Sequence, residues 1–566
     1  MTDAMASKAI PKAAGYGGST TSSSNPYANR ADKAFEENLQ KEEKHRAAQG
    51  RKRERQNGGS SDQVIDVETQ VKVPADIADK VLKKPRRECP YLSTVNRNVL
   101  DFDFERVCSV TMRDQNIYAC LVCGKFFQGR GKGTTAYLHS LECEHYVFIN
   151  LDNAKIYCLP DDYEVIDASL NDVKFNLRPK YQLHDILEID KGNHAKSLDG
   201  TDFIPGCVGL NNIKQSDYLN CFLQLLCVVI PVRNWLLLHE YEDKNTLALN
   251  GIHKKPEDPV VRTLSELMKK IYNPQNFKGI VSPHEVFQAI GKVSHKKFYG
   301  EQHDPVALFS YLMSYLARKK MPILTKTFEG EVGVKSSPVS LTNWTDSSHK
   351  SVVLQLDVPP APLFKENVNF IPQVPLFTLL EKYNGETIHE SIAKTGEDRQ
   401  QRKFTLRRLP PYVLFQIKRF KHNGYFTEKN PTIINFPLRD LDLKTYLHPG
   451  AAAANPITNY HLVASIIHSG KPKGGEYKIH CLHKELNTWH EVQDLRVSEV
   501  LPQAVALAIL GEENLRGHDN IIVMLGHKSS RLLCRLRLFR ACTQRKGLSV
   551  DLCMTSTNVF GPAGYL

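Results

Sequence analysis

The stretch from Gly209 to Leu226 (GLNNIKQSDYLNCFLQLL) constrains the fold of this chain more than any other, because a polar turn leads directly into an apolar run. Asp217 stands where the two meet, and the residues after it suit a buried helix whose first N–H groups are free. A cysteine at such a helix start would be a reactive thiolate of low pKa. The stretch therefore has the layout of a nucleophile site in which an acid occupies the nucleophile's position.

This layout resembles the cysteine box of the ubiquitin-specific proteases. The family pattern Gly-Leu-x-Asn-Leu-Gly-Asn-Thr-Cys-Tyr-Met-Asn-Ser-x-Leu-Gln aligns from Gly209 without a gap. The resemblance puts Asp217 on the catalytic cysteine and Gln215 on the asparagine that helps to stabilise the oxyanion. Two chemical positions have therefore changed, while the hydrophobic frame is retained.

A second stretch, Tyr460 to Ile479 (YHLVASIIHSGKPKGGEYKI), resembles the histidine box of the same family. The alignment puts Glu476 on the catalytic histidine, and Asp494 in TWHEVQDLRV matches the residue that orients this histidine in active members. Isopeptide cleavage by this fold needs a thiolate to attack and an imidazolium to protonate the leaving amine. Because Asp217 and Glu476 supply neither, the resemblance implies a protein without catalytic residues.

Three alternatives concern the same residues. Cys221 and His480 lie four residues beyond the lost positions, but four residues span about 6 Å in a helix and about 13 Å in a strand, so a shifted dyad does not form and we expect Cys221 in the core. Asp217, Glu476 and Asp494 could instead form a carboxylate cluster for Mg²⁺ or Ca²⁺. The simplest hypothesis is that Asp217 caps its helix and interacts favourably with the helix dipole.

Metal-ligand spacing appears further upstream, in YACLVCGKFFQGRGKGTTAYLHSLECEHYVF. Cys120 and Cys123 form a knuckle, and His139 and His145 follow after fifteen and five intervening residues. Two thiolates and two imidazoles suit one tetrahedral zinc, and a closed shell of four protein ligands indicates a structural ion. The alternative is a set of unrelated cysteines and histidines on a small α/β surface.

The same segment resembles the ubiquitin-binding zinc finger of ubiquitin-specific proteases, which holds up to three zincs in a cross-braced arrangement. Only one ligand set is complete here, since Cys89, Cys108 and Cys158 lack their usual partners. The resemblance implies that Tyr118 and Arg130 contact a free ubiquitin tail. A surface that docks another protein is the alternative.

Composition and patterning divide the chain into four parts. Residues 1–85 are poor in aromatics and rich in polar residues, which predicts a disordered basic tail. Residues 86–185 form the UBP-type zinc finger, 203–503 a catalytically dead ubiquitin-specific-protease-like domain, and 504–566 a divergent C-terminal tail. The expected fold class is α+β, with a papain-like protease fold, and the absence of cysteine between Cys227 and Cys481 excludes the zinc ribbon that many relatives carry.

Charge and cysteine usage favour a nuclear protein. The formal net charge is +12, and RKRER at Arg51 to Arg55 predicts a nuclear-localisation patch, the alternative being a solvated charged tail. Cysteine usage indicates a reducing compartment. The chain shows no secretory signal, and Cys221 to Leu238 is too polar and interrupted for a membrane span.

The resemblance narrows to one branch of the family. It rests on the two degenerate boxes, the single zinc finger and the segments CPYLSTVNRNVLDFDFE, IPQVPLF and NPTIINFP. This branch is the inactive, ubiquitin-specific-protease-like family of the spliceosomal tri-snRNP, the snRNP assembly-defective family. It implies a non-catalytic splicing scaffold whose partners are tri-snRNP proteins, with a ubiquitin or ubiquitin-like partner and direct RNA contact left open. The alternatives are a ubiquitin-binding adaptor and an active deubiquitinating cysteine protease.

Overall fold

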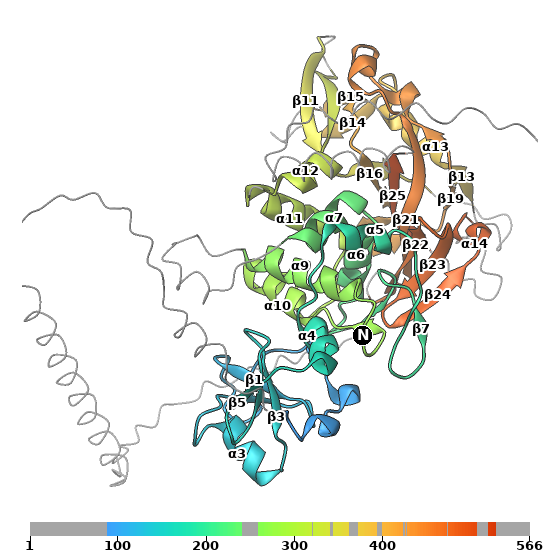
Figure 1. Ribbon diagram of the computed structural model, residues 1–566. Coiled ribbons are helices and arrows are strands. Elements are labelled where there is room, and N and C mark those ends of the chain that lie inside the picture. The colour runs from blue at the N-terminus through green and yellow to red at the C-terminus, as the bar shows by residue number, and fades with distance from the viewer. Residues whose placement is uncertain are drawn as a thin grey trace, which may run out of the picture. The chain divides into compact units, whose positions relative to one another are not determined.

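The computed structural model describes residues 88–239, 258–319, 321–339, 343–360, 372–392, 399–422, 425, 427–471, 474–506 and 519–527. The predicted disordered tail and its basic patch lie outside these residues, as does the chain after His527. Below, residues 88–185 are called the finger domain and residues 203–527 the large domain (Figure 1).

A five-stranded antiparallel sheet in the order β2-β1-β3-β4-β5 forms the centre of the finger domain. Its strands are β1 (Ile117–Cys120), β2 (Phe126–Gln128), β3 (Val147–Asn150), β4 (Ile156–Cys158) and β5 (Tyr163–Val165), accompanied by η1 (Leu92–Thr94), η2 (Arg97–Val99) and α3 (Thr135–Glu142). Every residue of β1 and of β3 is buried, as short apolar runs in a central strand require.

The segment between the two domains is structured rather than linker-like. η3 (Ala168–Leu170) and α4 (Asn171–Leu177) still belong to the finger domain, because Leu170, Val173 and Leu177 pack in its core. They are followed by α5 (Leu183–Ile189), which runs past the end of the finger domain, and by β6 (Ala195–Lys196) and β7 (Asp202–Phe203). Because β6 and β7 pair antiparallel, the chain forms a small hairpin where it enters the large domain.

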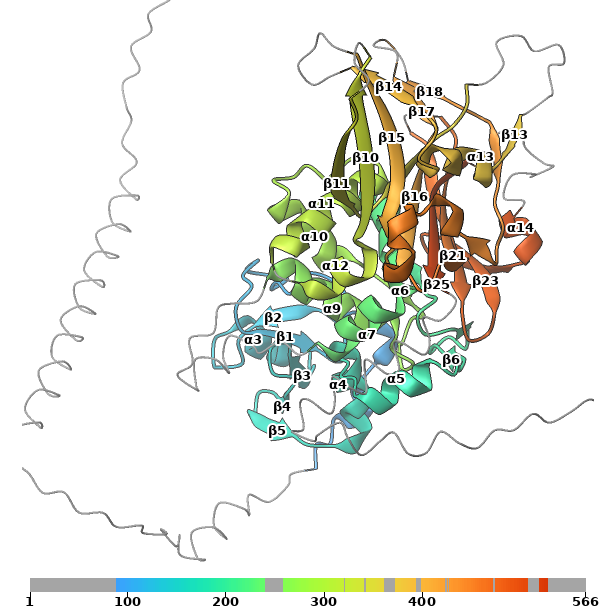
Figure 2. The same ribbon diagram turned by 90° about the horizontal axis from the view of Figure 1, so that it is seen from above.

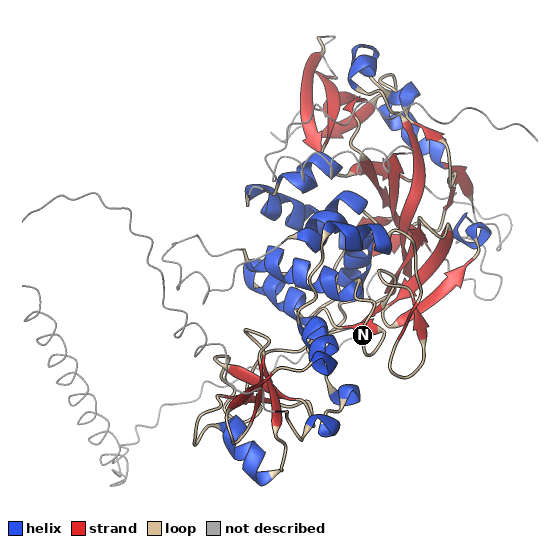
Figure 3. Cartoon of the chain, in the orientation of Figure 1, coloured by secondary structure: helices blue, strands red, loops and turns tan. Residues whose placement is uncertain are grey.

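Six helices cover one face of the main sheet of the large domain (Figure 3). They are α6 (Asp217–Cys227), α7 (Ile230–Leu238), α9 (Pro259–Ile271), α10 (His284–Val293), α11 (Pro305–Arg318) and α12 (Pro322–Phe328). All residues of α6 are buried, in agreement with the predicted buried helix. The short parallel pair β8 (Gly209–Leu210) and β9 (Ile280–Val281) fixes the entry to α6.

The main sheet runs in the order β12-β16-β25-β21-β22-β23-β24, with β20 beside β21. The strands are β12 (Leu354–Asp357), β16 (Tyr412–Lys418), β20 (Leu441–Asp442), β21 (Asn459–Ser469), β22 (Glu476–His483), β23 (Thr488–Gln493), β24 (Arg496–Val500) and β25 (Asp519–His527). Alternate residues of β16 point to opposite faces, as strand geometry dictates. Tyr412 and Leu414 join the core under the helices, whereas Val413 and Phe415 join a second core on the other face.

A separate four-stranded sheet has the order β11-β10-β15-β14 (Figure 2). Its strands are β10 (Gly330–Pro338), β11 (Thr345–Ser351), β14 (His389–Ile392) and β15 (Arg399–Arg408). The remaining elements are β13 (Gln373–Pro375), β17 (Phe420–His422), β18 (Thr427–Lys429), β19 (Ile433–Asn435), α13 (Leu376–Leu380), η4 (Glu381–Tyr383), η5 (Lys444–Tyr446), η6 (Pro449–Ala454) and α14 (Pro502–Ala506). Val332 of β10 and Leu406 of β15 pack into the second core, so apolar contacts anchor a sheet that contains no cysteine.

The predicted end of the large domain at Gln503 is wrong. Strand β25 lies between β16 and β21 in the middle of the main sheet, and its residues Ile522 to Leu525 are buried. A short apolar run such as IIVML fits a buried strand or a buried helix equally well, and its sequence does not show which strands flank it. The large domain therefore continues at least to His527.

The alternation of helices with mostly antiparallel sheets confirms the α+β class. Among the described residues, no single helix is long and apolar enough to cross a membrane. The one pair that passes this test together, α6 and α7, is bent by 91°.

Candidate functional site

Two thiols of the finger domain come from a tight turn between its first two strands. Cys120 is the last residue of β1, and Cys123 lies in the turn to β2. Gly124 follows with a φ of 76°, and a side chain there would meet the carbonyl oxygen of Val99 at 2.3 Å. Only glycine combines this backbone conformation with such a close approach.

Two imidazoles face these thiols from other elements of the finger domain. His139 lies on α3, and His145 precedes β3. The ring of Phe127 stacks on His139 with 4.1 Å between ring centroids, which fixes the orientation of this imidazole. Helix α3 and the loop after it therefore bring both histidines to the knuckle.

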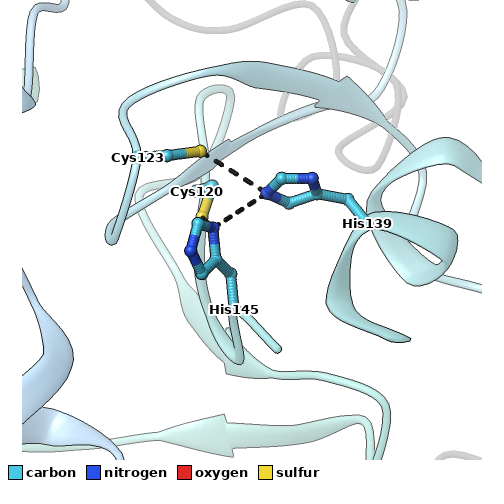
Figure 4. Close-up of side chains that lie close together, drawn as sticks. All are labelled: Cys120, Cys123, His139 and His145. Atoms are coloured by element: carbon cyan, nitrogen blue, oxygen red, sulfur yellow. Dashed lines mark hydrogen bonds between the residues drawn. The ribbon is translucent and has the colours of Figure 1, made fainter. Parts of the chain in front are cut away.

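The four side chains form a compact tetrad (Figure 4). Cys123 Sγ lies 3.4 Å from His139 Nε2, Cys120 Sγ lies 3.6 Å from His145 Nδ1, and the two imidazole nitrogens are 3.1 Å apart. Zn–S bonds of about 2.3 Å and Zn–N bonds of about 2.0–2.1 Å in a tetrahedron require S···N separations of about 3.5 Å and N···N separations of about 3.3 Å. The tetrad thus fits a tetrahedral zinc.

Other cysteines of the finger domain are not arranged in this way. Cys89, Cys108 and Cys158 are buried in its apolar core. Within the described parts of the chain, the tetrad is the one group of three or more His, Cys, Asp and Glu side chains whose ligand atoms lie this close together. Asp217, Glu476 and Asp494 therefore do not form the carboxylate cluster for Mg²⁺ or Ca²⁺ that the sequence left open.

Tyr118 and Arg130, which the sequence predicts to contact a ubiquitin tail, are engaged within the finger domain. Burial raises the pKa of Tyr118, and Arg130 is near enough to oppose that shift. The guanidinium of Arg130 lies over the ring of Tyr157, with Cζ 4.2 Å from the centroid, and forms an ion pair with Asp162. An incoming carboxylate would have to displace Asp162 from this guanidinium.

The turn before α6 has an unusual backbone. Ser216 occupies the N-cap position, so the predicted capping role of Asp217, which is the first residue of the helix, is wrong. The side chain of Asn212 supports the turn by accepting a hydrogen bond from Ser216 N at 2.8 Å. Lys214 and Gln215 have φ values of 51° and 60°, a left-handed conformation that is unfavourable for residues with a Cβ.

The buried carboxylate of Asp217 joins the start of α6 to the start of β22. Its Oδ1 accepts a hydrogen bond from Tyr218 N at 2.9 Å, and its Oδ2 accepts from Tyr477 N at 3.0 Å and from Gln302 Nε2 at 2.6 Å. The Gln302 amide also donates to the carbonyl of Gly475 at 2.7 Å. Burial raises the pKa of Asp217, and the three N–H donors oppose that shift. A site surrounded by N–H donors suits an anion rather than a cation.

The other two acidic residues lie in separate surroundings. Glu476 is exposed, and its carboxylate accepts a hydrogen bond from Gln493 Nε2 at 2.8 Å. Asp494 accepts hydrogen bonds from Asn212 Nδ2 at 2.9 Å and Asn220 Nδ2 at 2.8 Å. Asp494 therefore braces the turn before α6 and does not orient a base.

The shifted dyad does not form, as the sequence predicts. Cys221 is buried in the core, where burial raises the pKa of its thiol well above the usual range. His480 Nε2 pairs instead with Glu491 Oε2 at 2.9 Å. Cys221 therefore has neither the adjacent base nor the deprotonated thiol that nucleophilic catalysis needs.

Sequence reasoning missed Gln302. This residue is 85 positions away from Asp217. It stands in the stretch YGEQHDP, which contains no motif of its own. No signal in the sequence could have found it, because its contact depends on how α6, β22 and the loop before α11 pack.

Two family models match the chain. The model described as ubiquitin carboxyl-terminal hydrolase matches residues 208–520, and the model described as a Zn-finger in ubiquitin-hydrolases and other protein matches residues 107–170. The first match extends past Gln503, in agreement with the position of β25.

Similar proteins occur in human and in yeasts. "Ubiquitin carboxyl-terminal hydrolase 39" of Homo sapiens is 43% identical over 75% of this chain and 78% of its own length. "Probable mRNA-splicing protein ubp10" of Schizosaccharomyces pombe is 36% identical over 74% of this chain and 86% of its own. "Pre-mRNA-splicing factor SAD1" of Saccharomyces cerevisiae is 26% identical over 75% and 92%. A crystal structure of an essential yeast splicing factor shares the fold, with a TM-score of 0.62 and 24% identity over 78% of this chain and all of that one.

Proposed function

Because this chain belongs to the ubiquitin carboxyl-terminal hydrolase family and resembles two relatives named as splicing proteins, we propose that it is a pre-mRNA splicing factor that keeps the fold without the hydrolase reaction. The observation that supports this proposal is Asp217, which the resemblance to the cysteine box aligns with the family's nucleophile. Its carboxylate is buried and bonded to three N–H donors of the protein itself.

The chemistry of this centre supports a non-catalytic role. A carboxylate that attacked an isopeptide would form a mixed anhydride and would have to expel an amine that no imidazolium protonates. The Gln302 amide also links Asp217 to Gly475, so internal bonds occupy the space at the start of α6. Restoring a cysteine alone would not recreate a reactive centre, since a carboxylate at position 476 cannot form a thiolate–imidazolium pair and the Glu476 side chain is hydrogen-bonded to Gln493 instead.

The proposed role is that of a nuclear scaffold that supports assembly or stability of the spliceosomal tri-snRNP through protein contacts. A fold that keeps two well-packed cores without its chemistry acts through its surface. We further propose that Cys120, Cys123, His139 and His145 hold one structural zinc, which the S···N and N···N separations of the tetrad support.

Purification of the tagged, full-length protein from nuclear extract tests the proposal. Tri-snRNP proteins and small nuclear RNAs should copurify with it, and depletion of the protein should reduce tri-snRNP level and increase intron retention. Glu476→Ala should restore both, because the proposal gives this exposed residue no catalytic role. Turnover of a ubiquitin–fluorophore amide by the purified protein, or normal splicing after depletion, would contradict the proposal.

A ubiquitin-binding adaptor is the alternative, and Asp162 argues against it because it already pairs with Arg130. Titration calorimetry with free ubiquitin should therefore show no binding. Asp162→Asn frees the guanidinium and serves as the matched variant. Micromolar binding by the unmodified protein that Arg130→Ala abolishes would favour the adaptor.

A further inference from the structure

The segment Asp101–Arg106 (DFDFER) belongs to the stretch CPYLSTVNRNVLDFDFE and lies outside the site around Asp217. It runs along the large domain. We propose that this segment is an electrostatic clasp that makes the finger domain and the large domain one cooperative unit, and that the zinc tetrad holds the clasp in shape. The proposal does not depend on the role in splicing.

Two acidic residues of the clasp bind lysines of the large domain. Asp101 pairs with Lys278 at 2.6 Å, and Asp103 pairs with Lys270 at 2.9 Å. Asp103 also accepts a hydrogen bond from Ser282 N at 2.8 Å, and Lys270 donates to the backbone carbonyl before it, that of residue 102, at 2.8 Å. The side chains of Asp103 and Lys270 are only 19% and 12% exposed, so solvent screens this pair weakly.

The second half of the clasp engages α9 and α10. Glu105 lies 3.3 Å from His284 Nε2, while Arg106 approaches Glu285 at 3.5 Å and Glu266 at 3.8 Å. The clasp therefore carries three acidic side chains, at every second position, followed by one basic side chain. Asp101 and Asp103 face lysines of the large domain, and Arg106 faces two glutamates. The change of sign from Glu105 to Arg106 fixes the register, because a shift that put Glu105 in the place of Arg106 would bring it against Glu266 and Glu285.

Apolar and amide contacts continue the same interface. Phe277 of the large domain is buried in the apolar core of the finger domain. Asn176 of α4 donates to Gln275 O at 2.7 Å and accepts from Asn273 Nδ2 at 2.9 Å. The finger domain thus completes its core with a residue of the large domain, which independent domains joined by a linker do not do.

The clasp is connected directly to the zinc knuckle. Asn96 N donates to Leu121 O of the knuckle at 2.9 Å, and Gly124 packs against Val99. Residues 96–99 lead without interruption into the clasp at Asp101. Loss of the metal would free the knuckle, and with it residues 96–99, which lead into the clasp.

Two signals that report the domains separately test this proposal on the full chain. All three tryptophans, Trp235, Trp344 and Trp489, belong to the large domain, so their fluorescence follows its unfolding. Zinc release to a chromogenic chelator follows the finger domain. In the unmodified protein the two thermal transitions should coincide.

The triple variant D101N/D103N/E105Q removes the clasp's acidic charges without changing side-chain size. Zinc release should then precede the tryptophan transition by about 5 °C or more, since the largely buried Lys270 and the more exposed Lys278 both lose their charged partners. The matched control is Glu164→Gln, which breaks the exposed pair of Lys155 and Glu164 within the finger domain and should keep the transitions together.

Two results would overturn the proposal: transitions that are already separate in the unmodified protein, and transitions that stay together in the triple variant. If the triple variant does not fold, Lys270→Gln alone serves the same purpose. This single change must also separate the two signals, and their coincidence would again refute the clasp.

Discussion

At the scale of single residues, Asp217, which the sequence resemblance aligns with a nucleophile, acts as a structural link. The N–H of Tyr218 at the start of α6, a group of the kind that would stabilise a thiolate, donates to this carboxylate. Its two long-range partners, Gln302 and Tyr477, give it a role that helix capping does not describe. Glu476, at the other degenerate position, has a single exposed hydrogen bond.

Replacing these two acids by alanine should therefore have unequal effects. Asp217→Ala leaves the Tyr477 N–H and the Gln302 amide buried without their acceptor, and should lower the free energy of unfolding by about 2–3 kcal/mol. Glu476→Ala should change it by less than about 0.5 kcal/mol. Urea unfolding monitored by circular dichroism measures both. If Asp217→Ala lowered the free energy of unfolding as little as Glu476→Ala, the buried network would not be stabilising.

A second residue-scale prediction concerns the turn before α6. Gln215 is exposed with a φ of 60°, so Gln215→Gly should relieve backbone strain and raise the free energy of unfolding by about 0.5–1 kcal/mol. The control Lys335→Gly places glycine at an exposed position of strand β10, where it should destabilise by a similar amount. The same urea titrations give both values, and a destabilised Gln215→Gly variant would contradict the strain argument.

At the scale of elements, we expect a metal to stabilise the finger domain, because its strands are only three or four residues long. Short strands bury little apolar surface, so metal binding supplies folding free energy that packing does not. The main sheet of the large domain differs in this respect. Its longest strand, β21, has eleven residues, and apolar cores cover both faces of the sheet.

Loss of one zinc ligand should therefore unfold the finger domain. Metal analysis of the unmodified protein should give about one zinc per chain, and Cys123→Ser should abolish binding and the melting transition that zinc stabilises. Cys143→Ser is the matched control, because Cys143 is exposed and lies outside the tetrad. A zinc content near zero in undamaged protein, or unchanged melting of Cys123→Ser, would refute the assignment.

At the scale of the whole molecule, several histidines of the large domain are held neutral by burial. Burial lowers the pKa of His468, His483 and His527 to about 4, compared with 6.5 for a free side chain. The unfolded chain therefore binds protons more readily than the folded protein at intermediate pH. The stability these histidines contribute is complete above pH 6.5 and is lost as the pH falls toward 4.

Acidification should accordingly lower Tm by roughly 5 °C between about pH 7.5 and about pH 5.5. His527→Gln keeps a polar partner for the Tyr460 hydroxyl and should reduce the pH dependence. His184→Gln should leave it unchanged, because the His184 side chain is 72% exposed. Differential scanning calorimetry across this pH range measures all three proteins. A Tm that is independent of pH would show that these imidazoles are not shifted in the folded state.

The sequence by itself determined the features that depend on local spacing and residue type. The intervals between Cys120, Cys123, His139 and His145 predict a tetrad because a knuckle and one helix-loop segment suffice to bring these residues together. The apolar periodicity after Asp217 predicts α6, and the residue types at positions 217 and 476 predict the lost chemistry. None of these inferences requires knowledge of distant contacts.

Only the tertiary structure decided the features that depend on residues far apart in the chain. Gln302 meets Asp217 across 85 positions, β25 finds its place between β16 and β21, and Asp103 pairs with Lys270 across 167 positions. The physical reason is the same in each case. A hydrogen-bonding amide, a short apolar run or an acidic residue has many potential partners, and the packing of the whole chain selects one of them.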